Sequence, residues 1–238
     1  MKGLDIVVPV YNEGEQLLPW LQQVTSYLQI GDRLVIVDAS DASDSADTKS
    51  LKDFIANHKS LHYLLAEKGR AVQMNAGAEY LLTIEDYTPE LFWFLHSDSV
   101  LSKQHLDYLR RFDALPVWGR FDVRLSSRSL PAIIISAFIN LRSRLTQVMT
   151  GDQGIFIRAD IFQQLGGYSL IPLMEDVEIS KRLRKIAKAD CAGPVLKTSA
   201  RRWQKNGWLK TVLLMWQLRF MYWRGVSADE LAKKYYGK

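Results

Sequence analysis

The chain has 238 residues, of which 47% are hydrophobic and 24% charged, a composition typical of a globular protein with a buried core. The net charge of +5 is unevenly placed, because residues 201–238 carry nine Lys or Arg and only two acids. The preceding 200 residues are slightly acidic, which argues against a basic nucleic-acid-binding face and for an anionic partner of the C-terminal segment.

Cysteine content and the N-terminal sequence bear on the compartment. Cys191 is the only cysteine, which excludes a disulfide framework and a cysteine-based zinc site and suits a reducing compartment. Asp5 interrupts any signal-peptide core, and no uncharged apolar stretch is long enough to cross a bilayer. We therefore expect a cytoplasmic protein without a transmembrane helix.

The first hundred residues alternate between strand and helix patterns. Strands are predicted at Leu4–Val10, Leu34–Val37, Leu61–Leu65 and Leu91–Leu95. Apolar residues at helical spacing predict an amphipathic helix over 17–28, and a second long helix is predicted at Arg70–Leu82. This alternation indicates an α/β fold with a mostly parallel sheet flanked by helices.

The pattern changes after residue 100. Val117–Leu125 alternates strictly between apolar and polar residues, so its polar face, which includes Arg120, is expected to be solvated. Further elements are predicted as a long apolar helix at Pro131–Met149, a short strand at Gly154–Ile157 and a helix at Ala159–Leu165.

A charged helix, Met174–Ala187, is expected to bury Ile179, Leu183 and Ile186. No linker, repeat or low-complexity tract interrupts the chain. We expect one domain, with a nucleotide-binding half at 1–100, an acceptor and catalytic half at 101–203, and a basic, aromatic helical tail at 204–238.

Polar residues follow three of the predicted strands. Asn12, Asp38 and Asp98 each stand where a buried strand ends, and the carboxyl ends of parallel strands meet at one sheet edge, where open α/β sheets bind ligands. Asp98 could hold a divalent cation on a diphosphate, or it could simply cap a helix or close a turn. Gly-x-Gly-x-x-Gly and P-loop patterns are missing, which argues against a dinucleotide or P-loop site.

The ordered set of motifs resembles the inverting glycosyltransferases of family 2, which have the GT-A fold, a Rossmann-like fold for nucleotide-diphospho-sugars. The segments that carry the resemblance are 8–13 (Val-Pro-Val-Tyr-Asn-Glu), 37–40 (Val-Asp-Ala-Ser), 95–98 (Leu-His-Ser-Asp) and 175–176 (Glu-Asp). The segment 69–78 looks like that of a small bacterial branch of the family. The resemblance covers the chain to about Trp203 and implies sugar transfer with inversion, in cell-surface glycan, glycolipid or related biosynthesis.

The resemblance also implies residue roles on the donor side. The nucleotide and diphosphate contacts it implies are Pro9, Tyr11, Glu13, Asp38 (to the base), Gly69, Arg70, Ser97 and Arg202. Asp98 ends the motif usually written Asp-x-Asp, which binds Mn²⁺ or Mg²⁺. The first acid of that motif is His96 here, and a neutral imidazole can ligate Mn²⁺ better than Mg²⁺, or it can bind a phosphate. Asp41 could supply part of the role of a second acid after Asp38.

On the acceptor side, the resemblance implies that Asp176 is the general base, with Glu175 beside it. Asp152 and Gln153 either bind sugar hydroxyls or form a turn. Arg202 and Trp203 resemble the end of a motif found in processive members, which would place a stacking ring at the sugar. Ser199 stands where that motif has Gln, which argues against a processive polymerase.

Residues 208–223 are apolar nearly all round, with aromatic side chains and only basic charges. Two alternatives remain open for them: a core or homodimer helix, or an interfacial helix on anionic lipid at the inner face of the plasma membrane. The partners expected for the whole chain are a nucleotide-sugar donor and a lipid-linked or small hydroxyl acceptor, without nucleic acid. The alternative function is a catalytically degenerate, membrane-associated nucleotide-binding protein.

Overall fold

The computed structural model describes residues 3–13, 16–40, 46–112 and 114–237. Strands and helices alternate through the first half of the chain, as the sequence predicts. These elements are β1 (Asp5–Val10), α1 (Leu17–Thr25), β2 (Arg33–Asp38), α2 (Ala46–Ala56), β3 (Leu61–Leu65), α3 (Arg70–Leu82) and β4 (Leu91–Phe94).

The second half is richer in helix. Its elements are α4 (Lys103–Arg110), β5 (Trp118–Gly119), β6 (Asp122–Leu125), α5 (Leu130–Thr146), the 3₁₀ turn η2 (Gly151–Gln153), β7 (Phe156–Arg158), α6 (Ala159–Gln164), α7 (Glu175–Leu183), β8 (Val195–Thr198), α8 (Arg201–Asn206), α9 (Trp208–Trp223) and α10 (Ala228–Tyr236).

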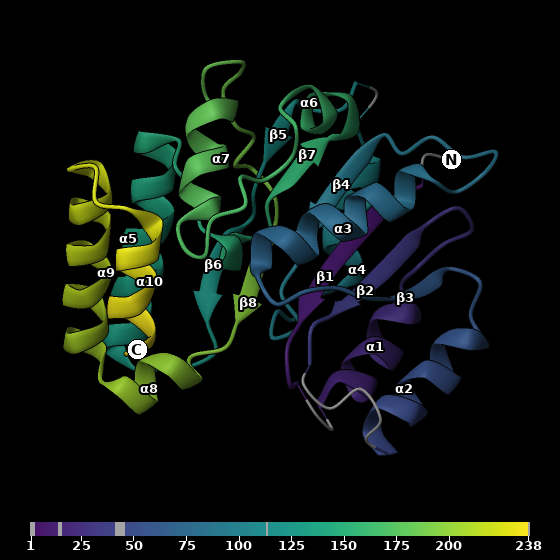
Figure 1. The fold of residues 1–238 in the computed structure, drawn as a ribbon, viewed down its shortest axis with the longest axis horizontal. Coiled ribbons are helices and arrows are strands. Elements are labelled where there is room, and N and C mark those ends of the chain that lie inside the picture. The colour runs from purple at the N-terminus through teal and green to yellow at the C-terminus, as the bar shows by residue number, and fades with distance from the viewer. Residues whose placement is uncertain (1–2, 14–15, 41–45, 113, 238) are drawn as a thin grey trace.

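Six strands form the central sheet, in the order β3-β2-β1-β4-β7-β5. The first four are parallel, with Val10 opposite Asp38 in the β1–β2 register, whereas β7 runs antiparallel to both β4 and β5. Helices cover both faces of this sheet (Figure 1). The prediction of a mostly parallel sheet flanked by helices is therefore confirmed, and β1, β2 and β4 end at the same edge.

Side chains of β1 alternate between two buried layers. Ile6 and Val8 belong to the cluster that includes Leu21 of α1, whereas Val7 packs in the opposite layer against α3. A Cβ added at Gly77 of α3 would lie 2.5 Å from Val7 Cγ1, so glycine is what allows α3 to approach the sheet closely. This tight contact places the first turn of α3 beside the strand ends.

Two predictions for the second half are wrong. The alternating segment Val117–Leu125 is divided between β5 of the main sheet and β6 of a separate two-stranded parallel sheet with β8. Arg120 lies at the crossing between them and is fully buried, bonded to Asp122 and to Ser143 Oγ (2.8 Å). Ile186 is 44% exposed, because α7 ends at Leu183 and the helical period does not continue to it.

The C-terminal helices form a layer beside the smaller sheet, at the left of Figure 1. Leu231 of α10 and Leu218 of α9 are fully buried in one cluster with Leu173, Met174 and Val177 at the start of α7. Helix α10 is thereby fixed against the end of α7 that carries Glu175 and Asp176. None of the helices within the described residues is long and apolar enough to cross a membrane.

Candidate functional site

The polar groups that follow β1 and β2 are joined by Ser40. Its hydroxyl donates to Asp38 Oδ1 (2.5 Å) and accepts from the backbone N–H of Asn12 (2.8 Å). Asn12 has a φ of 52°, a left-handed conformation that asparagine tolerates better than most residues. The two strand ends predicted to converge are therefore linked directly.

Asp38 is buried and held from both sides. Besides Ser40, the Tyr63 hydroxyl donates to its Oδ2 (2.6 Å), and burial together with this carboxylate raises the pKa of Tyr63 above its ordinary value. Oδ1 also accepts from the backbone N–H of Ser40 (2.8 Å), so Oδ2 is the oxygen that retains a lone pair with which Asp38 can accept from a ligand in a fixed orientation. Asp41 lies outside the described residues.

The turn before α3 lies next to the same edge. Gly69, with a φ of 154°, is the last residue of this turn, and Arg70 is the first residue of α3. The turn is therefore adjacent to the free N–H groups at the start of α3. Gln73 fixes this turn, because its amide donates to the backbone carbonyls at the ends of β1 and β2 (2.7 and 2.8 Å). Lys68 lies over the Tyr11 ring at 3.6 Å, while Pro9 is half-buried in β1.

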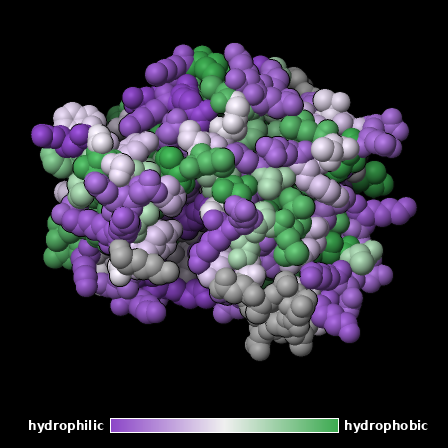
Figure 2. All heavy atoms as spheres, viewed as in Figure 1, coloured by the Kyte–Doolittle hydropathy of each residue, from purple (hydrophilic) through white to green (hydrophobic). Residues whose placement is uncertain are grey.

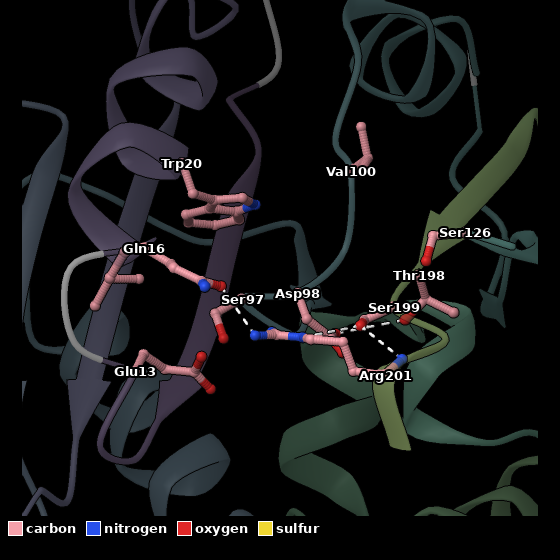
Figure 3. Close-up of a pocket in the computed structure, with 11 residues that line it drawn as sticks. Glu13, Gln16, Trp20, Ser97, Asp98, Val100, Ser126, Thr198, Ser199 and Arg201 are labelled. Carbon is pink, nitrogen blue, oxygen red and sulfur yellow. Dashed lines mark hydrogen bonds between the residues drawn. The ribbon is translucent and has the colours of Figure 1, made fainter. Parts of the chain in front are cut away.

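Asp98 opens into a pocket of about 270 Å³ between α1, the end of β4 and the segment after β8 (Figure 3). Its lining includes Glu13, Gln16, Trp20, Ser97, Asp98 and Arg201. Arg201 reaches across the pocket to Gln16 Oε1 (3.0 Å), and Thr198 donates a long hydrogen bond to Asp98 Oδ1 (3.4 Å). The sequence interpretation favoured Arg202 at the diphosphate, whereas Arg201 is the arginine that lines this pocket.

The electrostatics around Asp98 are unusual for a capping residue. Burial raises the pKa of Asp98, the negative charges of Asp152 and Glu13 raise it further, and Arg70 and Arg201 only partly offset them. An excess of negative charge in a buried pocket favours a bound cation. Asp98 therefore fits the carboxylate of a divalent-cation site better than a helix cap.

His96 lies against the backbone of η2. A Cβ added at Gly151 would be 2.8 Å from His96 Nε2, so the ring packs closely on this glycine. Burial and the charge of Arg70 lower the pKa of His96 to about 3, which keeps the imidazole neutral at physiological pH. In the described part of the chain no three His, Cys, Asp or Glu side chains converge on one point, so a cation here would depend on phosphate oxygens for most of its ligands.

Asp176 lies at the start of α7, after Met174, whose φ of 71° turns the chain into the helix. Its Oδ2 accepts from the backbone N–H of Gly151 (3.0 Å), and its Oδ1 accepts from that of Val177 (2.7 Å). Asp176 also lies in the first turn of α7, at the positive end of the helix dipole. Asp176 is thus held as an acceptor beside the same glycine that contacts His96.

Glu175 shares a small cavity with Asp176 and His96, with about 10 Å³ of free volume. The side chain is buried, and its carboxylate lies 4.0 Å from the guanidinium of Arg70. Burial and the charge of Asp176 raise the pKa of Glu175 to about 7 despite Arg70. Two adjacent carboxylates with different environments are a common arrangement in acid–base sites.

The two candidates in η2 have different places. Asp152 has one carboxylate oxygen buried without a hydrogen-bond partner among the described residues, with Arg142 and Arg219 as its nearest offsetting charges. Gln153 is fully buried, and its amide group bonds to Thr150 N (3.1 Å) and Ser143 Oγ (3.0 Å). Gln153 therefore braces the turn, which is one of the two alternatives for it, and its role as an acceptor contact stays a prediction.

The C-terminal helices bring two residues to the site that the sequence interpretation missed. The Arg202 guanidinium lies 4.0 Å from the centre of the Tyr235 ring, and burial raises the pKa of Tyr235 while Arg202 and Arg70 oppose the rise. Tyr236 adds to the electrostatic environment of Arg70. Trp203 stacks on Trp208 (6.2 Å between ring centroids). No spacing in the sequence connects residues 235 and 236 with residues 70 and 202.

Known proteins resemble this chain in fold and not in sequence. No protein-family model matches it, and a search of curated proteins gives no match. Among solved structures, the mannosyltransferase PcManGT from Pyrobaculum calidifontis, in complex with GDP-Man and Mn²⁺, is similar over 91% of this chain and 60% of its own, at 17% identity and a TM-score of 0.62.

TarS from S. aureus (residues 1–349) is similar at 14% identity, over 84% of this chain and 61% of its own, with a TM-score of 0.56. Its complex with UDP-GlcNAc gives a TM-score of 0.57, at 14% identity over 84% of this chain and 58% of its own. The chain thus spans about 60% of the length of these structures.

At these identities the likeness establishes the fold. The chain has a mixed α/β fold with a mostly parallel six-stranded sheet, and this fold is similar to those of PcManGT and TarS. The predicted fold class is therefore confirmed.

Proposed function

We propose that the chain is an inverting glycosyltransferase of family 2, which moves a sugar from a nucleoside-diphosphate donor to an acceptor hydroxyl. One observation carries this proposal. The Asp176 carboxylate is fixed by the Gly151 N–H on one side of the site, while Asp98 lies at the sheet edge in a pocket with an excess of negative charge. A base and a diphosphate site are the two parts that inverting sugar transfer requires.

The proposed contacts to the sugar donor are Asp38, Tyr11, Arg70 and Glu13. The fixed carboxylate of Asp38 can accept from the N3 proton of uracil or thymine, or from the N1 and N2 protons of guanine. PcManGT with GDP-Man and TarS with UDP-GlcNAc are examples of both kinds of base in this fold. Two groups at the start of α3 can bind the diphosphate: the charged side chain of Arg70 and the free backbone N–H groups of the first turn.

The negative charge of the leaving diphosphate needs a counter-charge. Asp98, with neutral His96 as a second ligand, would hold a divalent cation whose other ligands are phosphate oxygens. When bound, such a cation stabilises the charge that develops on the leaving group. Arg201 adds positive charge from the opposite side of the pocket.

Asp176 removes the proton from the acceptor hydroxyl. The freed oxygen pair bonds to the anomeric carbon from the face opposite the diphosphate, and the bond between that carbon and the phosphate oxygen breaks. The nucleoside diphosphate leaves with the electron pair, which inverts the configuration. Asp152, with its unbonded carboxylate oxygen, and Glu175 are the side chains proposed to contact the acceptor.

Two measurements test the proposal. A thermal-shift screen of nucleoside diphosphates with and without Mn²⁺ or Mg²⁺ should raise the unfolding temperature for one base, because ligands that bind only the folded state stabilise it. Asp98→Asn should remove the part of the shift that depends on the cation.

The second measurement follows transfer from the donor that the screen identifies. Asp176→Asn should lower turnover by about 10²–10⁴-fold, the usual contribution of a general base. Asp160→Asn is the matched control, because Asp160 is exposed, pairs with Arg158 and is not one of the site residues. Full activity of Asp176→Asn would show that the base has been assigned to the wrong residue.

A second candidate function is nucleotide binding without catalysis, and the histidine at position 96, where the motif has an acid, favours it. The two functions differ in outcome. Binding of a nucleoside diphosphate without hydrolysis or transfer of the sugar across many acceptors would support the second. For the transferase, a role in cell-surface glycan or glycolipid synthesis at the inner face of the plasma membrane is part of the proposal.

A further inference from the structure

Two neighbouring helices of the C-terminal layer each present an exposed apolar stripe. On α9 the stripe consists of Leu209, Leu213, Trp216, Phe220 and Trp223, which are 54–73% exposed. Their spacing of four, three, four and three residues places them on one face of the helix. The opposite side of α9 is the one that buries Leu218 against α7 and α10.

Helix α5 carries the second stripe. Its members are Leu130, Ile133, Ile134, Phe138, Leu141 and Leu145, which are 47–75% exposed. The Phe138 and Trp216 rings lie 5.8 Å apart between centroids, so the two stripes join into one surface. Figure 2 shows hydrophobic atoms at the left margin of the view, where α9 lies in Figure 1.

The joined surface is larger than an ordinary exposed apolar patch. Eleven side chains, each about half to three-quarters exposed, amount to an apolar area on the order of 1,000 Å². The largest patch on a typical monomer is about 300–600 Å². The two helices are about 25 Å long, so the apolar surface is elongated. A flat partner could contact it along the whole of this length.

Charge distinguishes among the possible occupants. Neither α5 nor α9 contains Asp or Glu, whereas the exposed cations Arg128, Lys210 and Arg224 lie on or just beyond them. Arg144 pairs with Asp122, and Arg142 is directed inward to the Val148 carbonyl (3.0 Å). A second copy of the same face would bring these basic groups together, whereas anionic lipid headgroups would neutralise them.

We infer that the α5–α9 surface binds an anionic lipid bilayer. The apolar stripes enter the boundary between headgroups and acyl chains, the aromatic residues Phe138, Trp216, Phe220 and Trp223 lie at that boundary, and the basic residues contact the headgroups. Helix α8 joins this surface to the pocket of Asp98, since Arg201 lines the pocket and α9 begins two residues after α8 ends. The inference does not depend on the proposed sugar transfer.

Flotation of the full chain with vesicles tests this inference. Binding to phosphatidylcholine vesicles that contain 30% phosphatidylglycerol should exceed binding to pure phosphatidylcholine by about tenfold and weaken as salt is added. The double variant Trp216→Ser/Phe220→Ser should lose binding by at least about tenfold, since two exposed apolar anchors are removed. Lys210→Glu/Arg224→Glu should lose the preference for anionic lipid.

The matched control is Ile30→Ser/Leu170→Ser, which removes two exposed apolar side chains from other parts of the surface and should leave flotation unchanged. Circular dichroism and thermal unfolding without ligand confirm that each variant is folded. Equal flotation of Trp216→Ser/Phe220→Ser and the unmodified chain would overturn the inference. So would a chain that floats with neither vesicle and instead forms a dimer that Trp216→Ser/Phe220→Ser dissociates.

Discussion

Replacing Glu175 by glutamine is expected to stabilise the protein at pH 8 and to change it little at pH 5. Burial and the charge of Asp176 raise the pKa of Glu175 from 4.5 to about 7, even with Arg70 nearby. The folded protein therefore holds this proton more tightly than the unfolded chain, and stability present at low pH is lost as the pH rises through about 7. Glutamine has nearly the same shape and never ionises, so it avoids this loss.

The size of the effect follows from the two pKa values of Glu175. Each tenfold difference in proton affinity is worth about 1.4 kcal/mol, so the ionised carboxylate costs the folded state about 3 kcal/mol at pH 8 and less than about 1 kcal/mol at pH 5. In a protein of this length, 1 kcal/mol shifts the unfolding temperature by about 2–4 °C. Glu175→Gln should therefore unfold about 6–12 °C higher than the unmodified chain at pH 8.

Thermal and urea unfolding of both proteins at the two pH values measure this difference without any knowledge of the substrate. Glu178→Gln is the control, because Glu178 occupies the same first turn but is paired with Arg182 at 2.6 Å. That variant should be unchanged or slightly less stable at both pH values. A Glu175→Gln protein that is destabilised equally at pH 5 and pH 8 would show that Glu175 acts as an ion-pair partner of Arg70, and the argument from burial would fail.

Three further predictions concern other groups. Gly151→Ala places a Cβ 2.8 Å from His96 Nε2 and should lower transfer at least about tenfold by displacing this turn, at a cost of about 1–3 kcal/mol in urea unfolding. Tyr235→Ala should weaken nucleoside-diphosphate binding about three- to tenfold by removing the ring under Arg202, whereas Tyr235→Phe should not, as titrations by calorimetry would show. Burial raises the pKa of Asp5 to about 7, so Asp5→Asn should gain stability relative to the unmodified chain as the pH rises from 5 to 8.

Much of the sheet and its ligand-binding edge could be predicted from the sequence. Runs of apolar residues such as Leu34–Val37 and Leu91–Leu95 are long enough to identify strands, and their alternation with helices indicates that the strands are parallel. Once the strands are parallel, Asn12 and Asp38 must lie at one edge. Local pattern and chain topology were sufficient for this part.

The predictions that depended on burial between distant segments were less successful. Arg120 stands at a polar position of an alternating run, yet it is fully buried, because the run crosses from one sheet to another and its charge is met by Asp122. Gln153 is a polar residue of a turn, as its pattern suggests, yet it is fully buried and its amide bonds to Ser143 of α5 and to Thr150. In each case the partner that decides the environment belongs to an element whose packing no local pattern reveals.

The C-terminal segment illustrates the same limit at the scale of the site. Its basic charge and aromatic content suggest a tail that is separate from the catalytic half. Packing does not stop at residue 203, because Leu231 of α10 is buried against the start of α7 and carries Tyr235 to Arg202. The face of α9 that packs against α10 lies opposite the exposed stripe, so both surfaces belong to one helix. Residues 208–236 therefore supply both the α9 half of the inferred membrane-binding surface and, through Tyr235, a wall of the candidate site, which accounts for their apolar and basic composition.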